Sequence, residues 1–485
     1  MKALKQVFDK YNNFPTLTKA SLWFLFCSFF QKGISVISTP IFTRLLTPEE
    51  FGSFSVFNSW LGIATAIVTL NLFGGVYIQG LVKFGKISRQ FSSNLQCLNL
   101  TLVIFWTCIY FIFESFWNDL LSLTTCQITL MLVLIWTSSV YNFWSSEQRV
   151  YCHYRSLVFV SLLVAILKPI LGILFVIYSN DKVTARILSL VVVELAIFSF
   201  LFFKQVLQGK SFFSISIWKY ALAFNIPLIP HYLSSSLLQT VDRIMIGSMI
   251  GSREAGIFSL GYSIAFLMTL FTNSLFQTLE PWLYKKIKER RIPEIKTVAY
   301  PVFAFIILLN LLLILAVPEI VYIFAPESYY EAVWVIPPIA ISTFFMFTYT
   351  FFAAFEFYFE KTKFITVATL SGALLKVVLN YFFLEGFGYQ FASYSTLLCF
   401  VTFALMHYLF MRKICAENFG NVQPYESKPL FLMSLILIVL GLVLMWTYQY
   451  KEVRYIFLTL TLLMIFLKRK YLISTFKSWL FLKNE

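Results

Sequence analysis

Long apolar runs recur along the whole chain and are separated by short polar segments. A helix of about 20 residues spans the roughly 30 Å hydrocarbon core of a bilayer. In lipid, a helix satisfies all of its own backbone hydrogen bonds. We therefore predict an all-α integral membrane protein with about fourteen transmembrane helices. The predicted helices are 20–44, 52–77, 93–114, 120–146, 156–178, 185–206, 220–248, 256–282, 297–324, 332–358, 364–384, 389–411, 429–449 and 454–475.

The composition points to the same class. Of the 485 residues, 59% are hydrophobic and 13% are charged, whereas soluble domains have about 25% charged residues. The interior of a globular protein cannot bury so much apolar surface, so the excess must face lipid. This excludes a soluble enzyme, a nucleic-acid-binding domain and a disordered tail protein. The longest gaps between predicted helices, 283–296 and 412–428, are too short for a soluble catalytic domain.

Membrane topology, rather than nucleic acid, explains the net charge of +15. With an even number of helices both termini lie on one side, and most Lys and Arg residues lie in the tails and loops of that side. By the positive-inside rule both termini are therefore predicted to be cytoplasmic. No small-residue cleavage site follows the first helix, which we interpret as a retained signal anchor. The opposite loops contain Arg44, Lys182, Arg186, Arg253, Lys451 and Arg454.

Cysteine and histidine give no sign of a metal or redox centre. The seven cysteines are scattered without a C-x-x-C pair, and the three histidines do not cluster. The sequence also lacks the glycine loop G-x-x-x-x-G-K-[ST] that binds nucleotide phosphates. We predict no cofactor, apart from a proton or sodium ion coupled to transport.

Two short segments match each other at a constant offset. Residues 50–56 read EFGSFSV and residues 254–260 read EAGIFSL, after the first and the seventh predicted helix. Both copies begin with an odd-numbered helix, so they run in the same direction through the bilayer, as in transporters with parallel repeats. We predict two six-helix lobes related by a pseudo-twofold axis, 1–210 and 211–415, followed by helices 13 and 14 in 416–485. Two such lobes around a central cavity are typical of alternating access.

Three lysines lie deep inside predicted helices. Lys32 shares a helix face with serines and a threonine, Lys376 with Thr369 and Asn380, and Lys168 with Ser161. An ionised side chain at the bilayer centre costs at least about 2.5–3.5 kcal/mol, so these groups need water or an anionic partner. We therefore predict a hydrated, cation-lined cavity that takes an anionic substrate.

Other charged residues leave alternatives open. Asp242 and Arg243 either serve transport or form a structural ion pair, and Glu280 either carries a coupled ion or lies solvated at the cytoplasmic mouth. Glu194 could pair with Lys168 and so reduce the free positive charge. His231 either binds substrate or satisfies carbonyls freed by the prolines before it.

Two segments resemble a known family. Residues 39–60, TPIFTRLLTPEEFGSFSVFNSW, and residues 225–264, which include Asp242–Arg243, are similar to bacterial oligosaccharide-lipid flippases. These are the O-antigen and capsule repeat-unit translocases, in the superfamily that also holds multidrug and toxin extrusion transporters and the peptidoglycan-precursor flippase. The resemblance implies translocation of undecaprenyl-diphosphate-linked oligosaccharide from the cytoplasmic to the outer leaflet of the bacterial inner membrane, without ATP. By matching position, Arg44 and Arg243 are the basic residues that close the first helices of the two lobes.

Together these arguments predict a substrate-binding site and favour a transporter over an enzyme. The predicted substrate-binding residues are Lys32, Arg44, Lys168, Arg243, Lys376 and His231, and the coupling-ion candidates are Asp242 and Glu280. The partners implied are the lipid-linked oligosaccharide, membrane lipids, a polysaccharide polymerase and a chain-length regulator. Two rival hypotheses are a drug exporter of the same fold, which would need an acidic cavity, and a membrane-embedded polymerase or ligase, which usually needs a large outer loop.

Overall fold

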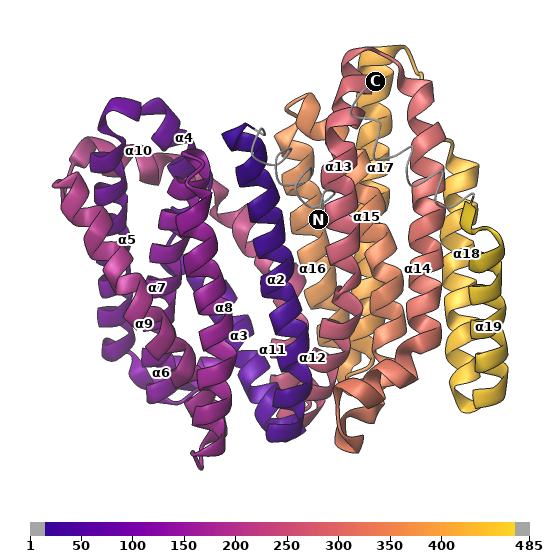
Figure 1. Cartoon of the computed structure of the whole chain (residues 1–485), viewed down its shortest axis with the longest axis horizontal. Helices are drawn as coiled ribbons and strands as arrows, with labels where there is room; N and C mark the ends of the chain where they lie inside the picture. The colour runs from indigo at the N-terminus through magenta and orange to yellow at the C-terminus, as the bar shows by residue number, and fades with distance from the viewer. Residues whose placement is uncertain (1–14, 471–485) are drawn as a thin grey trace, which may run out of the picture. The chain divides into compact units, whose positions relative to one another are not determined.

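The computed structural model describes residues 15–470, which fold into helices joined by short loops (Figure 1). Twelve helical stretches in this range are long and apolar enough to cross a membrane. The chain is thus a multi-pass, all-α membrane protein, and the predicted fold class is confirmed to that extent.

Two of the fourteen predicted helices are not among these twelve stretches. The predicted helix 220–248 is interrupted, because α10 (Ile215–Asn225) is followed by a 3-10 turn, Ile226–Leu228, before α11 (Ile229–Met249) begins. Pro227 and Pro230 lack the backbone N–H that a continuous helix would need. For the predicted helix 454–475, the structure has α19 (Lys451–Leu467), and the part after residue 470 lies outside the described residues.

The chain divides into two compact units, with the boundary between Ser236 and Leu237, inside α11. In the first unit α9 packs against α5, α7 and α8, and α8 also packs against α2, so these long helices lie side by side (Figure 1). Besides α10 and the start of α11, the helices of this unit are α2 (Thr16–Leu45), α3 (Pro48–Val68), α4 (Gly75–Lys83), α5 (Ser88–Ile112), α6 (Glu114–Leu121), α7 (Thr125–Val150), α8 (Tyr154–Ile177) and α9 (Lys182–Gly209).

The second unit is organised around α15, which packs against α12, α13, α14, α17 and α18. The most apolar stretch of α15 is 83% buried, whereas that of α2 is 11% buried. Most side chains of α15 are therefore enclosed by neighbouring helices of the unit. The helices after α11 are α12 (Ser252–Phe266), α13 (Met268–Lys288), α14 (Ile295–Phe324), α15 (Ile336–Tyr358), α16 (Thr362–Phe387), α17 (Phe391–Phe419), α18 (Ser427–Trp446) and α19.

The two matching sequence segments each lie at the start of a helix. In α3, Thr47 and Glu50 form a reciprocal cap, in which the Thr47 hydroxyl accepts from Glu50 N–H and the Glu50 carboxylate accepts from Thr47 N–H at 2.8 Å. In α12, which begins at Ser252, the matching Glu254 lies in the first turn, where a carboxylate complements the helix dipole. The repeated glutamate therefore has a local reason, helix initiation.

Candidate functional site

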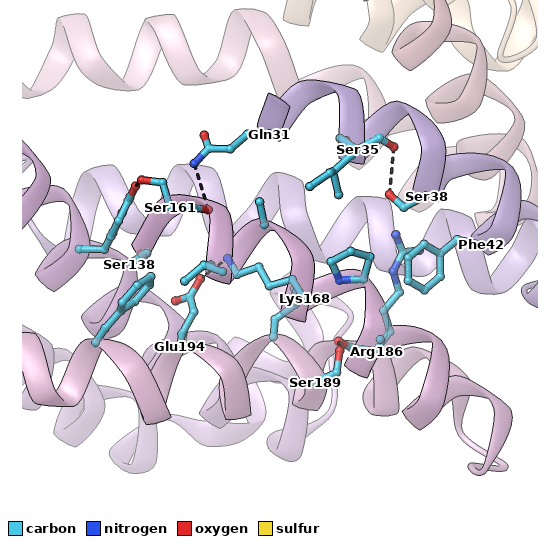
Figure 2. Close-up of a pocket in the computed structure, with 18 of the residues that line it drawn as sticks. Gln31, Ser35, Ser38, Phe42, Ser138, Ser161, Lys168, Arg186, Ser189 and Glu194 are labelled. Atoms are coloured by element: carbon cyan, nitrogen blue, oxygen red, sulfur yellow. Dashed lines mark hydrogen bonds and ion pairs between the residues drawn. The ribbon is translucent and has the colours of Figure 1, made fainter. Parts of the chain in front are cut away.

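A cavity of about 440 Å³ lies inside the first unit, among α2, α3, α7, α8 and α9. Its wall combines apolar side chains with hydroxyl and amide groups from several helices. Figure 2 shows Gln31, Ser35 and Ser38 of α2 along one side of this cavity, across from Lys168 and Glu194. The volume falls in the range of small-molecule sites, about 300–1,000 Å³. The polar lining includes Gln31, Ser35, Ser38, Ser138, Tyr141, Asn142, Ser161, Lys168, Arg186, Ser189 and Glu194.

Lys168 and Glu194 form an ion pair in this wall. Nζ of Lys168 lies 2.6 Å from Oε1 of Glu194, and the Thr137 hydroxyl donates to the other carboxylate oxygen at 2.5 Å. The Lys168 side chain is 31% exposed, whereas that of Glu194 is 7% exposed. The pairing that the sequence left open is therefore present. The lysine charge is compensated, but its ammonium group remains accessible from the cavity.

Arg186 is the second cation of the cavity. Its guanidinium lies between two phenylalanine rings, 3.9 Å from the centroid of Phe42 and 3.7 Å from that of Phe54 (Figure 2 shows Phe42). A guanidinium over aromatic faces is held by cation–π contacts, which fix the position of Arg186 in the wall. The charged lining residues are Lys168, Arg186 and Glu194, which leaves one positive charge in excess.

Hydrogen bonds hold the polar wall in place. The Gln31 amide donates to the Ser161 carbonyl at 3.4 Å, and the hydroxyls of Tyr141 and Ser161 are 2.6 Å apart. These contacts connect α2, α7 and α8. Next to Lys168, Pro169 lies inside α8 and lacks the N–H that would bond the carbonyl of Ala165, another lining residue. The wall can therefore offer both donors and acceptors to sugar hydroxyls or to a phosphate.

Lys376, which has the same kind of polar stripe in the sequence, is placed differently. In the second unit its Nζ lies 2.5 Å from Oδ2 of Asp242 and donates to the Leu238 carbonyl at 2.6 Å. The side chains of Lys376 and Asp242 are 0% and 1% exposed. The Asn380 amide and the Thr396 hydroxyl complete the hydrogen bonds of the carboxylate, at 2.7 and 3.0 Å. This pair is sealed inside the unit.

The other predicted residues of the first unit lie outside the cavity lining. Lys32 is exposed on α2, one turn before Ser35. Arg44 is exposed at the end of the same helix and donates to the Pro40 carbonyl at 2.8 Å. His231 is half-buried at the start of α11, and its Nδ1 has no hydrogen-bond partner among the described residues.

In the second unit, Asp242 pairs with Lys376 rather than with its neighbour Arg243, so the alternative of an Asp242–Arg243 ion pair is wrong. Arg243 instead lies over the ring of Tyr262, 4.3 Å from its centroid. The two side chains have different neighbours because adjacent residues on a helix point about 100° apart. Glu280 is half-buried on α13, about one helical turn before Tyr284.

Arg186 was assigned to an outer loop by the charge tally, and that assignment is wrong, because it lies inside α9 and lines the cavity. A signal for it was present in the sequence. Arg186, Leu190, Glu194 and Phe198 recur every four residues, and all four line the cavity. Residues four apart lie on one face of a helix, so this spacing places Arg186 and Glu194 on the same face of α9.

The family of the chain follows from comparison with known proteins. A family model described as "Polysaccharide biosynthesis protein" matches residues 17–287, which is more than half of the chain and contains the whole cavity. The chain belongs to the polysaccharide biosynthesis protein family. A second model, MatE, matches residues 227–382. These are families of transporters and not of enzymes.

Two proteins of Haemophilus influenzae are similar in sequence to this family member. "Lsg locus putative protein 1" is 23% identical over 387 residues, which are 74% of this chain and 89% of the relative. An "Uncharacterized membrane protein" is 24% identical over 394 residues, 74% of this chain and 88% of the relative. The similarity thus extends well beyond the two short segments that resemble the family in the sequence.

Solved structures share the fold. The chain is similar to "Lipid II flippase MurJ, inward closed conformation" with a TM-score of 0.69 and 14% identity, over 92% of this chain and 99% of that one. It is also similar to an inward-facing multidrug resistance MATE family transporter, with a TM-score of 0.61 and 15% identity, over 79% and 95% of the two chains. The architecture is therefore that of MurJ and MATE transporters.

Proposed function

We propose that this chain is a flippase that moves an oligosaccharide linked to undecaprenyl diphosphate from the cytoplasmic to the outer leaflet of the bacterial inner membrane. Membership of the polysaccharide biosynthesis protein family supports a glycan cargo. The observation that carries the proposal within this family is the cavity of the first unit, whose wall includes hydroxyl and amide groups, two cations and one carboxylate.

The cavity suits the headgroup of such a lipid. A phosphate would accept from the Arg186 guanidinium and the Lys168 ammonium, since charge-assisted hydrogen bonds are the strongest that side chains make. The hydroxyl and amide groups of the wall would bind the first sugar. The remaining sugars exceed a volume of about 440 Å³, so they would extend out of this cavity while the polyprenyl chain stays in lipid.

The Lys168–Glu194 ion pair lowers the net positive charge expected for the cavity. The mid-helix lysines are predicted to line a hydrated cavity, with a Glu194–Lys168 pair left open, and in the structure Lys168 and Lys376 both pair with carboxylates. Counted over the lining residues, two cations, Lys168 and Arg186, face one carboxylate, Glu194. A modest excess favours a cargo that must bind and then leave, because a strongly cationic cavity would retain a diphosphate. With an inside-negative membrane potential, outward movement of each negative charge gains about 2.3 kcal/mol per 100 mV.

A translocation assay tests the proposal. The full chain is reconstituted in proteoliposomes with a fluorescent oligosaccharide linked to undecaprenyl diphosphate, and a membrane-impermeant quencher reports which leaflet holds it. We expect protein-dependent translocation that Arg186→Glu abolishes, because the cavity then becomes net acidic. Translocation no faster than in protein-free vesicles would contradict the proposal. In cells, deletion of the gene should cause lipid-linked oligosaccharide to accumulate on the inner leaflet.

The MatE match over residues 227–382 favours a second candidate function, export of small molecules. A cationic drug would be repelled by the positive excess of the cavity, so Arg186→Glu should accelerate its export. The same variant thus has opposite effects under the two proposals.

A further inference from the structure

A carboxylate and an imidazole meet in the interior of the second unit. Glu356, near the end of α15, and His407 on α17 are 0% and 1% exposed, and Oε1 of Glu356 lies 2.7 Å from Nδ1 of His407. Tyr349 stacks on the imidazole with 5.3 Å between ring centroids, and Phe403 meets it edge-on at 4.5 Å. The imidazole is thus held by two aromatic rings and one carboxylate.

Each group has a second polar atom that no part of the described chain satisfies. Oε2 of Glu356 and Nε2 of His407 are buried and make no hydrogen bond to any residue between 15 and 470. A buried polar atom without a partner costs about 1–3 kcal/mol. A pair that served stability alone would be expected to satisfy these atoms, as the Asp242 carboxylate is satisfied.

The partner distinguishes Glu356 from the two carboxylates described above. Glu194 and Asp242 pair with lysines, whose ammonium groups keep their protons at neutral pH. Glu356 pairs with an imidazole, the side chain that gains and loses a proton between about pH 5 and pH 8. Of these three pairs, Glu356–His407 is therefore the one that can change its proton content near neutral pH.

Other charges around the pair are at the surface or are engaged. Among the described residues, His407 is the titratable side chain that contacts Glu356, and Tyr349 is the other titratable side chain against the imidazole. At this end of the neighbouring helices, Lys361 pairs with Glu417 at 3.6 Å. The further ion pairs there join Lys286 and Arg291 to Glu294, Lys285 and Arg291 to Glu289, and Lys296 to Glu426. Other exposed charges there are Lys288, Arg290, Glu360, Lys363, Arg412, Lys413 and Lys428.

We propose that Glu356 and His407 form a proton-binding site that links the transport cycle to pH. In the proton-poor state, Nδ1–H of neutral His407 donates to the Glu356 carboxylate, and the pair carries one negative charge. A proton from water adds to Nε2, which gives an imidazolium opposite a carboxylate with no net charge, and its return to water restores the first state. Because a buried net charge is costly, the two states favour different packing around α15 and α17.

Proton binding can be tested without any cargo. The full chain, with isotope-labelled histidine, is placed in lipid nanodiscs; its three histidines give three imidazole signals, and His407→Gln identifies one of them. Between about pH 5 and pH 8 the His407 signal should titrate. Glu356→Gln should shift the midpoint by about one pH unit or more. The matched control Glu385→Gln, which changes an exposed carboxylate on α16, should leave the midpoint unchanged.

The proposal is overturned if His407 does not titrate in this range, or if Glu356→Gln leaves its midpoint where it was. Thermal unfolding of each variant establishes that it is folded, and Glu356→Gln keeps the shape of the side chain. If His407→Gln alone fails to fold, Glu356→Gln still decides the outcome.

The link to transport rests on the proposed function and needs the proteoliposome assay. An imposed pH gradient should accelerate translocation by about fivefold or more, the usual range of coupling between sites. In Glu356→Gln and His407→Gln the acceleration should disappear. An unchanged acceleration in both variants would overturn the link. If the unmodified chain moves no cargo under any condition, the proposed function fails, and the histidine titration still decides whether the pair binds a proton.

Discussion

The two lysine–carboxylate pairs, Lys168–Glu194 in the first unit and Lys376–Asp242 in the second, differ in what surrounds them. Lys168 is 31% exposed and faces a cavity of about 440 Å³. Lys376 is 0% exposed, and the Leu238 carbonyl takes a further hydrogen bond from its ammonium group. The first pair can therefore exchange its partner for a ligand, whereas the second cannot without unpacking the unit.

This difference shows how a charged residue in a membrane helix serves two purposes. A buried ion pair contributes little net stability over an apolar pair of the same size, but it is costly to break. It therefore specifies which helices lie together, here α11 and α16. A pair beside a cavity keeps its charge solvated and can meet a substrate. Four experiments, ordered by the size of the expected effect, test this comparison.

The largest effect is expected from Lys376→Met. It leaves the Asp242 carboxylate buried without its counter-charge, which costs about 3–5 kcal/mol. The free energy of unfolding in detergent should fall by that amount. The double variant Lys376→Met/Asp242→Asn removes both charges and should recover most of the loss. If the free energy of unfolding of Lys376→Met lies within about 1 kcal/mol of that of the unmodified chain, the Asp242 carboxylate is accessible to solvent.

Thr396→Val should have the next largest effect. It removes the hydroxyl that donates to Oδ2 of Asp242 at 3.0 Å, and a buried hydrogen bond to a charged group contributes about 1.5–3 kcal/mol. Thr137→Val removes the corresponding bond to Glu194 and should cost less, because that carboxylate borders the cavity. The free energy of unfolding of both variants is measured under the same conditions. An equal loss in the two variants would contradict the expectation that the Asp242 pair is the more enclosed one.

Arg186→Leu should act on transport more than on stability. It removes the excess positive charge of the cavity, and the loss of one charge-assisted hydrogen bond to a phosphate corresponds to about a tenfold lower rate of translocation. Arg186→Lys keeps the charge but cannot stack as a flat group between Phe42 and Phe54, so an intermediate rate is expected. If the unmodified chain, Arg186→Leu and Arg186→Lys translocate the cargo at equal rates in the proteoliposome assay, Arg186 does not bind the cargo.

Lys168→Met should have the smallest effect on stability. Glu194 keeps its hydrogen bond from Thr137, and the accessible pair is expected to contribute about 1 kcal/mol or less. The free energy of unfolding is measured beside that of Lys376→Met. A loss of unfolding free energy as large as that of Lys376→Met would mean that the two ion pairs contribute equally to stability.

Much of the fold is readable from the sequence because lipid leaves few alternatives to an apolar helix. The runs that became α5, α7, α8 and α9 were predicted within a few residues, and the prolines before His231 explain why 220–248 is interrupted. The site was harder. Lys168 and Lys376 have equivalent polar stripes, and nothing in either stripe indicates which of the two faces a cavity. Glu356 and His407 lie 51 residues apart and share no motif.

Apolar run length alone determined that this protein is helical and crosses the membrane, because a backbone in lipid must bond to itself. Which charges are compensated was decided by tertiary structure, since an ion pair depends on helices that are distant in sequence and adjacent in space. Packing placed Glu194 beside Lys168, Asp242 beside Lys376, and Glu356 beside His407. It also turned Arg186 into a cavity residue, because only neighbouring helices can supply the two rings that hold its guanidinium.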